Sequence, residues 1–250
     1  MSLVEEYQLQ FRWRPWNLIF EEVPLERGQT IFDLGCGIGD QARELASRGC
    51  RVIGLDWNQE LIDAARVDNG PDCQFLTCDL RNPPDVGVVA DGIWCSFTAA
   101  YLTNLTDFLT IWSRFLRSGG WIAITEIENL FGHEPLRPRT RLLLEDFSND
   151  ARAAGRYDFH MGGKLESHLA EAGFAVTRVL ALPDHELAFQ GPAMPDVLEA
   201  WRRRFERLPG LRSLCASEFA SVQEDFLSCL SRPDHVSTAK VITCVGTKGG

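Results

Sequence analysis

The sequence predicts an α/β fold in which helices cover both faces of a mainly parallel, doubly wound sheet. Short apolar segments alternate with helix-like segments along much of the 250 residues, a pattern typical of parallel βαβ units. A glycine-rich turn follows the first apolar segment, and an acid ends the second. These segments are IFDLGCGIGD at residues 31–40 and VIGLD at residues 52–56. Together they predict a nucleoside pocket at the carboxyl edge of the sheet.

The individual elements follow from the same hydrophobic pattern, taken in chain order. Apolar runs predict strands at residues 30–34, 51–55, 73–77, 89–96, 120–127, 174–182 and 239–246. Helices are expected at residues 40–48, 58–67, 105–117 and 164–172. Ser118, Gly119 and Gly120 are predicted to end the third helix, and Gly173 to end the fourth.

The chain is expected to form one domain over residues 1–250, because no repeat, low-complexity tract or linker divides it. Residues 11–16 (FRWRPW) mix cationic and aromatic side chains, which suits either a lid or an arm packed on the sheet edge. Residues 201–207 (WRRRFER) suit the solvated face of an amphipathic helix. The alternative for this basic run is binding of an anionic acceptor.

Composition favours a globular protein that does not bind nucleic acid. Apolar residues make up 45% and charged residues 24% of the chain. The net charge of −10 argues against a surface built for nucleic-acid phosphates. We expect a cytoplasmic protein without a membrane partner, because no signal-peptide pattern or span-length apolar run is visible. The eight cysteines include no C-x-x-C pair, so reduced thiols and no metal site are expected.

The spacing of the glycines distinguishes two kinds of nucleotide pocket. A dinucleotide fingerprint is G-x-G-x-x-G, whereas residues 33–39 form D-x-G-x-G-x-G, with Asp40 where a third glycine would stand. A carboxylate there disfavours a pyrophosphate and suits a ligand with a cationic head. The segment resembles the first motif of the class I S-adenosylmethionine (SAM)-dependent methyltransferases. A NAD-dependent oxidoreductase is the disfavoured alternative.

The resemblance covers residues 30–128 by motif and 164–247 by topology. It implies a seven-stranded sheet whose last strand is antiparallel, with SAM as cofactor and S-adenosylhomocysteine as product. It also implies that residues 1–28 form a lid or arm, and that residues 129–160 and 184–236 form a cap or acceptor pocket. The cofactor-binding residues that it implies are Arg14, Asp33, Gly35, Cys36, Gly37, Gly39, Asp56, Trp57, Asp79, Leu80, Ser96 and Phe97.

Each of the implied polar contacts has its own role in the resemblance. Asp33 would meet the amino group of the methionine moiety, and Arg14 its carboxylate. Asp56 would accept the ribose hydroxyls, and Trp57 would lie flat on the adenine. Asp79 would accept a hydrogen bond from the adenine amino group, although an acid that starts a loop also suits capping.

Methyl transfer from a sulfonium is an in-line displacement, so the protein mainly aligns and desolvates the reactants. A base is needed only where the acceptor must lose a proton. The candidate bases are Glu126, Glu128 and His133 after the predicted fifth strand and Tyr101 after the fourth, with Tyr157 and His160 in the segment that follows. His133 and His160 stand out because histidine titrates near neutrality.

The predicted function is methyl transfer to a small-molecule acceptor. In the resembled family, enzymes that methylate amines carry an acid or Asn, then Pro-Pro and an aromatic residue, at the end of the fourth strand, and this sequence has no such run there. It also lacks the cluster of Asp and Asn that would hold a magnesium ion for O-methylation. One alternative is a macromolecular methyltransferase acting on protein or RNA, against which a helical cap over the site would count. Another is a SAM-binding protein that transfers no methyl group.

Overall fold

A seven-stranded sheet organises the protein, whose computed structural model describes residues 3–67, 70–84 and 86–249. The first two residues of the predicted N-terminal arm lie outside the described residues. The strand order is β3-β2-β1-β4-β5-β9-β7, and β9 is antiparallel to both of its neighbours. The strands are β1 (Thr30–Leu34), β2 (Arg51–Asp56), β3 (Cys73–Thr77), β4 (Ala90–Ser96), β5 (Leu116–Glu128), β7 (Phe174–Leu182) and β9 (Lys240–Lys248). The predicted fold class, with its antiparallel last strand, is confirmed.

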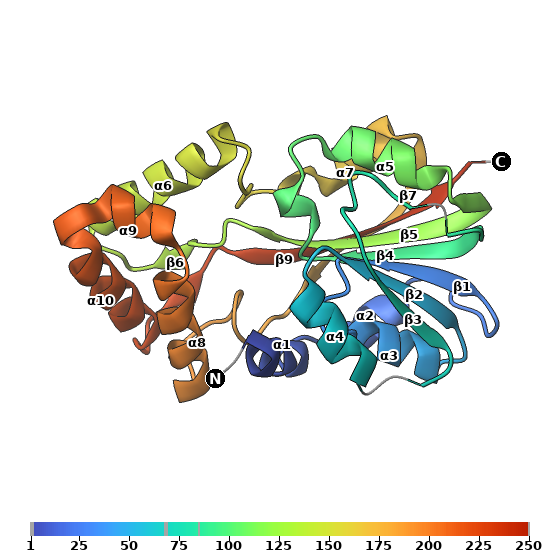
Figure 1. Cartoon of the computed structure of the whole chain (residues 1–250). Coiled ribbons are helices and arrows are strands. Elements are labelled where there is room, and N and C mark those ends of the chain that lie inside the picture. The colour runs from blue at the N-terminus through green and yellow to red at the C-terminus, as the bar shows by residue number, and fades with distance from the viewer. Residues whose placement is uncertain (1–2, 68–69, 85, 250) are drawn as a thin grey trace.

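Helices cover both faces of this sheet (Figure 1). One face carries α2 (Trp16–Phe20), α3 (Asp40–Ser47) and α4 (Gln59–Val67), and the other carries α5 (Leu105–Ser113) and α7 (Leu165–Glu171). The side chains of β1 alternate between the two resulting cores: Ile31 packs in one and Phe32 in the other. A strand buried on both faces is mainly apolar, which is why residues 31–34 stood out in the sequence, with Asp33 as the one charged residue among them.

A helical lobe lies beyond the carboxyl ends of the strands (Figure 1). Its four helices are α6 (Pro138–Ala153), α8 (Pro195–Glu206), α9 (Pro209–Cys215) and α10 (Phe219–Leu230). A two-stranded sheet of β6 (His133–Glu134) and β8 (Val236–Ser237) joins the segments that enter and leave it. We call residues 129–160 and 184–237 the cap. Its core gathers around Phe131, whose ring lies within 6.4 Å of the rings of Trp201, Phe205 and Phe226.

The N-terminal helix α1 (Leu3–Arg12) lies between the cap helix α8 and the helices on the lower face of the sheet in Figure 1. The side chains of Arg207 and Glu6 form an ion pair that connects the end of α8 to α1. Three short 3₁₀ helices complete the fold: η1 (Ala99–Tyr101), η2 (Gly162–Lys164) and η3 (Ala216–Glu218). Among the described residues, no helix has both the length and the apolar character of a transmembrane span.

One predicted boundary is wrong. The third predicted helix, α5, ends at Ser113 rather than near 117, and the predicted helix stop at residues 118–120 lies inside β5. The pairing of β4 with β5 shifts register here, because Ala90 pairs with Leu116 but Gly92 pairs with Trp121. Gly119 has a φ of +70°, and this conformation allows the irregularity within β5 rather than ending a helix.

Candidate active site

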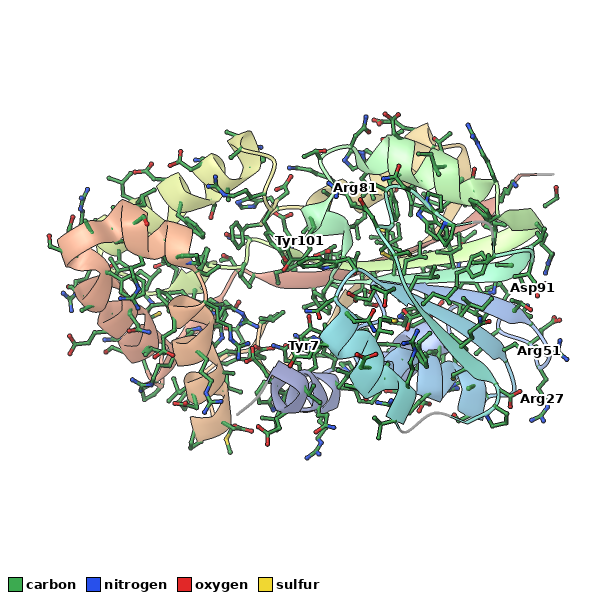
Figure 2. The ribbon with its side chains drawn as sticks, viewed as in Figure 1. Tyr7, Arg27, Arg51, Arg81, Asp91 and Tyr101 are labelled. Atoms are coloured by element: carbon green, nitrogen blue, oxygen red, sulfur yellow. The ribbon has the colours of Figure 1, made fainter. Side chains whose placement is uncertain are left out.

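A cavity of about 970 Å³ lies at the carboxyl ends of β1, β2 and β4, between the sheet and the cap. Its walls come from α1, the glycine turn, the loops after the strands, and α8. Figure 2 shows Tyr7 and Tyr101 at this junction, whereas Arg27, Arg51 and Asp91 mark the opposite, amino edge of the sheet. The cavity therefore occupies the edge at which doubly wound sheets bind ligands.

The glycine turn is held tightly between β4 and α1. Gly35, Gly37 and Gly39 have φ values of +77°, +53° and +80°, which favour glycine. A Cβ on Gly35 would lie 1.9 Å from Oγ1 of Thr98, and one on Gly37 would lie 2.9 Å from Cε1 of Tyr7. The turn therefore leaves no room for side chains on its inner side. Gly37 and Gly39 shape the turn without being part of the cavity wall.

Two unpartnered polar atoms face the cavity beside this turn. Oδ2 of Asp33 and Oγ of Ser96 are buried and have no hydrogen-bond partner, and both residues line the cavity. Burial, followed by the nearby charge of Asp56, raises the pKa of Asp33 to about 8. A cationic group placed here would give both oxygen atoms a partner and favour the ionised carboxylate, so the site fits an ammonium group.

Asp56 at the end of β2 has its carboxylate fixed by the backbone. Its Oδ2 accepts a hydrogen bond from Gly37 N at 3.0 Å, and its Oδ1 accepts one from Asn58 N at 2.9 Å. The side chain is only 6% exposed, and burial raises its pKa despite these bonds. Trp57 follows it with 79% of its surface exposed and lines the same cavity. This pair is arranged to receive a polar ring hydroxyl and a flat apolar ring, respectively.

The remaining implied cofactor residues, Cys36, Asp79, Leu80 and Phe97, also line the cavity. Asp79 is not free, since the guanidinium of Arg81 binds both of its oxygens at 2.8–3.1 Å. These hydrogen bonds lower its pKa. A hydrogen bond that Asp79 accepted from a ligand would therefore compete with those from Arg81.

Arg14 lines the cavity, but the structure does not support its predicted pairing with a cofactor carboxylate. Its Nη2 lies 2.9 Å from Oε2 of Glu186, and its Nε lies 2.9 Å from Oδ2 of Asp184. The guanidinium also lies over the ring of Phe97, 4.5 Å from the centroid. Two buried carboxylates already balance its charge, so Arg14 connects the N-terminal arm to the loop before α8.

Of the candidate bases, Tyr101 and Tyr157 line the cavity, whereas Glu126 is not among its lining residues. Glu126 is fully buried, and its carboxylate accepts hydrogen bonds from Ala100 N at 2.9 Å and Ile127 N at 3.1 Å. Burial raises its pKa to about 7. Glu126 therefore holds η1, which carries Tyr101.

The two histidine candidates are not brought to the cavity. His133 is completely buried in the cap, where its Nδ1 lies 3.0 Å from Nε2 of His235. Burial lowers the pKa of His133 to about 3. His160 lies outside the cavity lining, with its Nδ1 2.9 Å from Oε1 of Glu128. The loop-like sequence around both histidines gave no sign that they pack elsewhere.

Two polar residues of the cavity were not predicted from the sequence. Tyr7 from α1 and Arg204 from α8 line it together with Tyr101 and Tyr157. The chain has three tyrosines, so all of them line this one cavity. Arg204 belongs to the basic run 201–207, whose alternative interpretation was the binding of an anion. No local signal pointed to Tyr7. In the described part of the chain, no group of three or more His, Cys, Asp or Glu side chains could hold a metal ion.

Comparison with known proteins shows which proteins this chain resembles. Residues 31–120 match the methyltransferase domain family. Trans-aconitate 2-methyltransferase of Mycobacterium tuberculosis (strain ATCC 25177 / H37Ra) is 35% identical over 118 residues, which are 45% of this chain and 42% of the relative. The Escherichia coli (strain K12 / DH10B) enzyme of that name is 40% identical over 73 residues, or 28% of this chain and 29% of its own. The chain thus matches less than half of each of these relatives.

Solved structures with the same fold cover nearly the whole chain at low identity. A SAM-dependent methyltransferase from Mesorhizobium loti has a TM-score of 0.55 at 19% identity, over 93% of this chain and 97% of its own. The cyclopropane synthase MmaA2 from Mycobacterium tuberculosis has a TM-score of 0.61 at 18% identity, over 93% of this chain and 82% of its own. The [4+2]-cyclase SpnF has a TM-score of 0.61 at 16% identity, over 93% of this chain and 80% of its own. The resemblance found in the sequence is confirmed: residues 31–120 match the methyltransferase domain family, and the chain has the class I fold.

Proposed function

We propose that the protein binds SAM at the carboxyl edge of the sheet and transfers its methyl group to a small-molecule acceptor. The observation that most supports this is the unpartnered Oδ2 of Asp33 beside the backbone-fixed carboxylate of Asp56. A cation would give Asp33 its missing partner, and ribose hydroxyl groups would donate to the fixed carboxylate of Asp56. The match of residues 31–120 to the methyltransferase domain supports the same ligand.

The residues of the cavity divide the binding of SAM among them in this proposal. Asp33 and Ser96 hold the ammonium group of the methionine moiety, Asp56 holds the ribose, and Trp57 covers the adenine. When bound, SAM supplies an electrophilic methyl group, and the protein contributes alignment and exclusion of water. Arg14 is not assigned to the cofactor, because Asp184 and Glu186 already occupy it.

The enclosure of the cavity supports a small acceptor over a protein or RNA. The cap and α1 stand over the strand ends, and the ion pair between Glu6 and Arg207 links them across the site. The names of the M. tuberculosis and E. coli relatives point to a small acid as their acceptor. We therefore also propose that no nucleic acid is involved, and we keep the cytoplasmic location as part of the proposal.

A second candidate is a protein that binds SAM without methyl transfer. The [4+2]-cyclase SpnF shares this fold over 93% of the chain, so the fold alone does not establish methyl transfer. The two candidates differ in one product. Methyl transfer releases S-adenosylhomocysteine when an acceptor is present, whereas a protein that only binds SAM releases none.

The decisive experiment is calorimetric titration of SAM and S-adenosylhomocysteine into the wild type and Asp56→Ala. We expect micromolar binding that weakens at least tenfold in the variant, or about 1.4 kcal/mol. Asp63→Ala is the matched control, because Asp63 is an exposed acid on the neighbouring helix α4. No binding of either ligand to folded wild type, or equal binding by Asp56→Ala, would contradict the proposal.

A further inference from the structure

The three tyrosines present unused hydroxyl groups to the cavity. Tyr7, Tyr101 and Tyr157 all line it, and the rings of Tyr101 and Tyr157 meet edge to face at 4.7 Å. Among the described residues, none of the three hydroxyl groups has a hydrogen-bond partner. Burial raises the pKa of all three. At neutral pH they therefore carry their protons and act as hydrogen-bond donors.

Arg204 adds a cationic donor to this group. Its Nη2 pairs with Oε1 of Glu186, and its guanidinium lies 4.6 Å from the ring centroid of Trp201. These contacts fix the guanidinium, yet its Nη1 is buried and has no hydrogen-bond partner. A buried donor without a partner destabilises the protein, and a ligand oxygen would supply the missing hydrogen bond. The charge of Arg204 partly offsets the rise in the pKa of Tyr101 and Tyr157, so Arg204 acts on the same part of the cavity.

The cavity offers no free base to an acceptor. The carboxylates among its described lining residues are Asp33, Asp40, Asp56 and Asp79, and no histidine is among them. Asp40 pairs with Arg43 and Asp79 with Arg81, while Asp33 and Asp56 are assigned to the cofactor. An alcohol, a phenol or an ammonium group would have to lose a proton to react, and nothing here would accept it.

The cavity also has a substantial apolar lining. Phe11, Trp16, Phe97, Leu130 and Leu187 contribute to it, alongside the polar Gln10 and Arg207. Arg14 and Arg204 share Glu186, and Arg14 also pairs with Asp184, so this buried group has no net charge. Attraction for an anion would then come from unused donors and from the positive charge of the bound sulfonium rather than from a net positive wall.

From these observations we propose that the acceptor is a carboxylate on an apolar body, held by Arg204 and the three tyrosine hydroxyl groups. This inference rests on the proposed function and specifies its substrate class. A carboxylate oxygen forms one O–CH₃ bond as one S–CH₃ bond breaks, giving a methyl ester and a neutral thioether. No proton moves in this step, which is why a cavity without a base suffices.

The test is a panel of small carboxylic acids with apolar bodies, each matched with its primary amide and its alcohol. Binding is measured calorimetrically to protein saturated with S-adenosylhomocysteine, and methyl esters are detected by mass spectrometry with SAM. We expect acids that bind at least tenfold more tightly than their amides and yield methyl esters. The absence of acids among the ligands, or equal binding of acid and amide, would overturn the inference.

Two variants test the residues directly. Arg204→Lys keeps a cation for Glu186 but removes the spare guanidinium donor, and we expect it to weaken acid binding at least tenfold. Tyr101→Phe removes one hydroxyl group and keeps the ring, and a several-fold loss is expected. The matched control is Arg202→Lys, an exposed arginine on the same helix. Unchanged acid affinity in both Arg204→Lys and Tyr101→Phe would also overturn the inference.

Failure of the cofactor proposal would be visible separately. If S-adenosylhomocysteine does not bind the wild type, the panel is titrated into the unliganded protein instead. Binding of acids that Arg204→Lys weakens would then support the carboxylate site and contradict only the assignment of the cofactor. No binding of acids in that titration would contradict both.

Discussion

On the sheet side of the cavity, buried carboxylates lack cationic partners, whereas on the cap side they are paired with arginines. Asp33 and Asp56 are 2% and 6% exposed and form no ion pair within the described residues. Across the cavity, Asp184 and Glu186 are equally buried but are held by Arg14, and Glu186 also by Arg204. Arginines therefore offset the cost of burying charge on the cap side, whereas no ion pair offsets it on the sheet side.

This difference shows which side awaits a ligand charge. On the sheet side, Asp33 reaches neutrality by holding a proton, as its raised pKa indicates, and a cationic ligand can replace that proton. On the cap side, the charges cancel within the protein, so what remains for a ligand is hydrogen-bond donors. A sulfonium compound with an ammonium group suits the first side, and an oxygen-rich anion suits the second.

The largest expected effect comes from breaking the paired side. Arg14→Met would leave Asp184 and Glu186 with one arginine between them, and we expect a loss of about 3–5 kcal/mol in unfolding free energy. Urea denaturation followed by circular dichroism measures it. A loss below about 1 kcal/mol would mean that these charges are far better solvated than their burial suggests, and the contrast between the two sides would fail.

A smaller effect should follow from removing the ionisable group of Asp33. The folded pKa of Asp33 is about 8, against an unfolded value of about 3.9. Between these values the folded state holds a proton that the unfolded state lacks, so wild-type stability falls as pH rises. Asp33→Asn cannot ionise, and should therefore gain about 2 kcal/mol relative to wild type between pH 6 and pH 8.

That gain is measured without cofactor, as the difference between two unfolding free energies at each pH. Asp63→Asn, which alters an exposed acid on α4, should track the wild type throughout. If Asp33→Asn also runs parallel to the wild type, Asp33 is ionised in the folded protein and must have a counter-charge.

The cap core should respond to acid with the opposite sign. The folded pKa of His133 is about 3 and its unfolded value about 6.5, so the unfolded state takes up the proton first as pH falls. From pH 6.5 to 5.5, this group should cost the wild type about 1 kcal/mol that His133→Asn does not lose. His185→Asn, at an exposed site, should keep the wild-type profile, and an identical profile for His133→Asn would contradict the buried neutral imidazole.

The smallest effect is expected at an exposed ion pair of the cap. Arg139 binds both carboxylate oxygens of Glu218, but both side chains are largely exposed. Solvent screens such pairs, so Arg139→Gln should leave the unfolding transition unchanged. A measurable loss of unfolding free energy in Arg139→Gln would mean that exposed ion pairs also stabilise the cap. The contrast between buried and exposed pairs would then fail.

The sheet and its glycine turn could be predicted from sequence because their signals are local. An apolar run with a glycine turn directly after it determines β1, and Asp56 lies at the end of the next apolar run. Gly119 shows the limit of such signals, because a glycine with positive φ suits a helix end and a strand bulge equally. The pairing of Gly92 with Trp121, which decides between them, is a contact between distant residues.

The cap side could not be predicted in the same way. Arg14 and Glu186 are 172 positions apart, and nothing near Arg14 in the sequence indicates that two acids occupy it. His133 was chosen for its chemistry, yet the rings of Trp201, Phe226 and His235 surround it in the core of the cap. The chemistry of a side chain can suggest that it belongs to a site. Contacts between residues far apart in the sequence determine whether that side chain is exposed to solvent or to a ligand.

The concentration of every tyrosine in one cavity has a practical consequence for observing the protein. Fluorotyrosine incorporated throughout the chain would place its three ¹⁹F nuclei on Tyr7, Tyr101 and Tyr157, with none on the remaining surface. The three resonances would come from α1, from η1 and from the cap, so each wall reports separately. Ligand occupancy and movement of α1 against the cap could then be followed by NMR without any substitution in the chain.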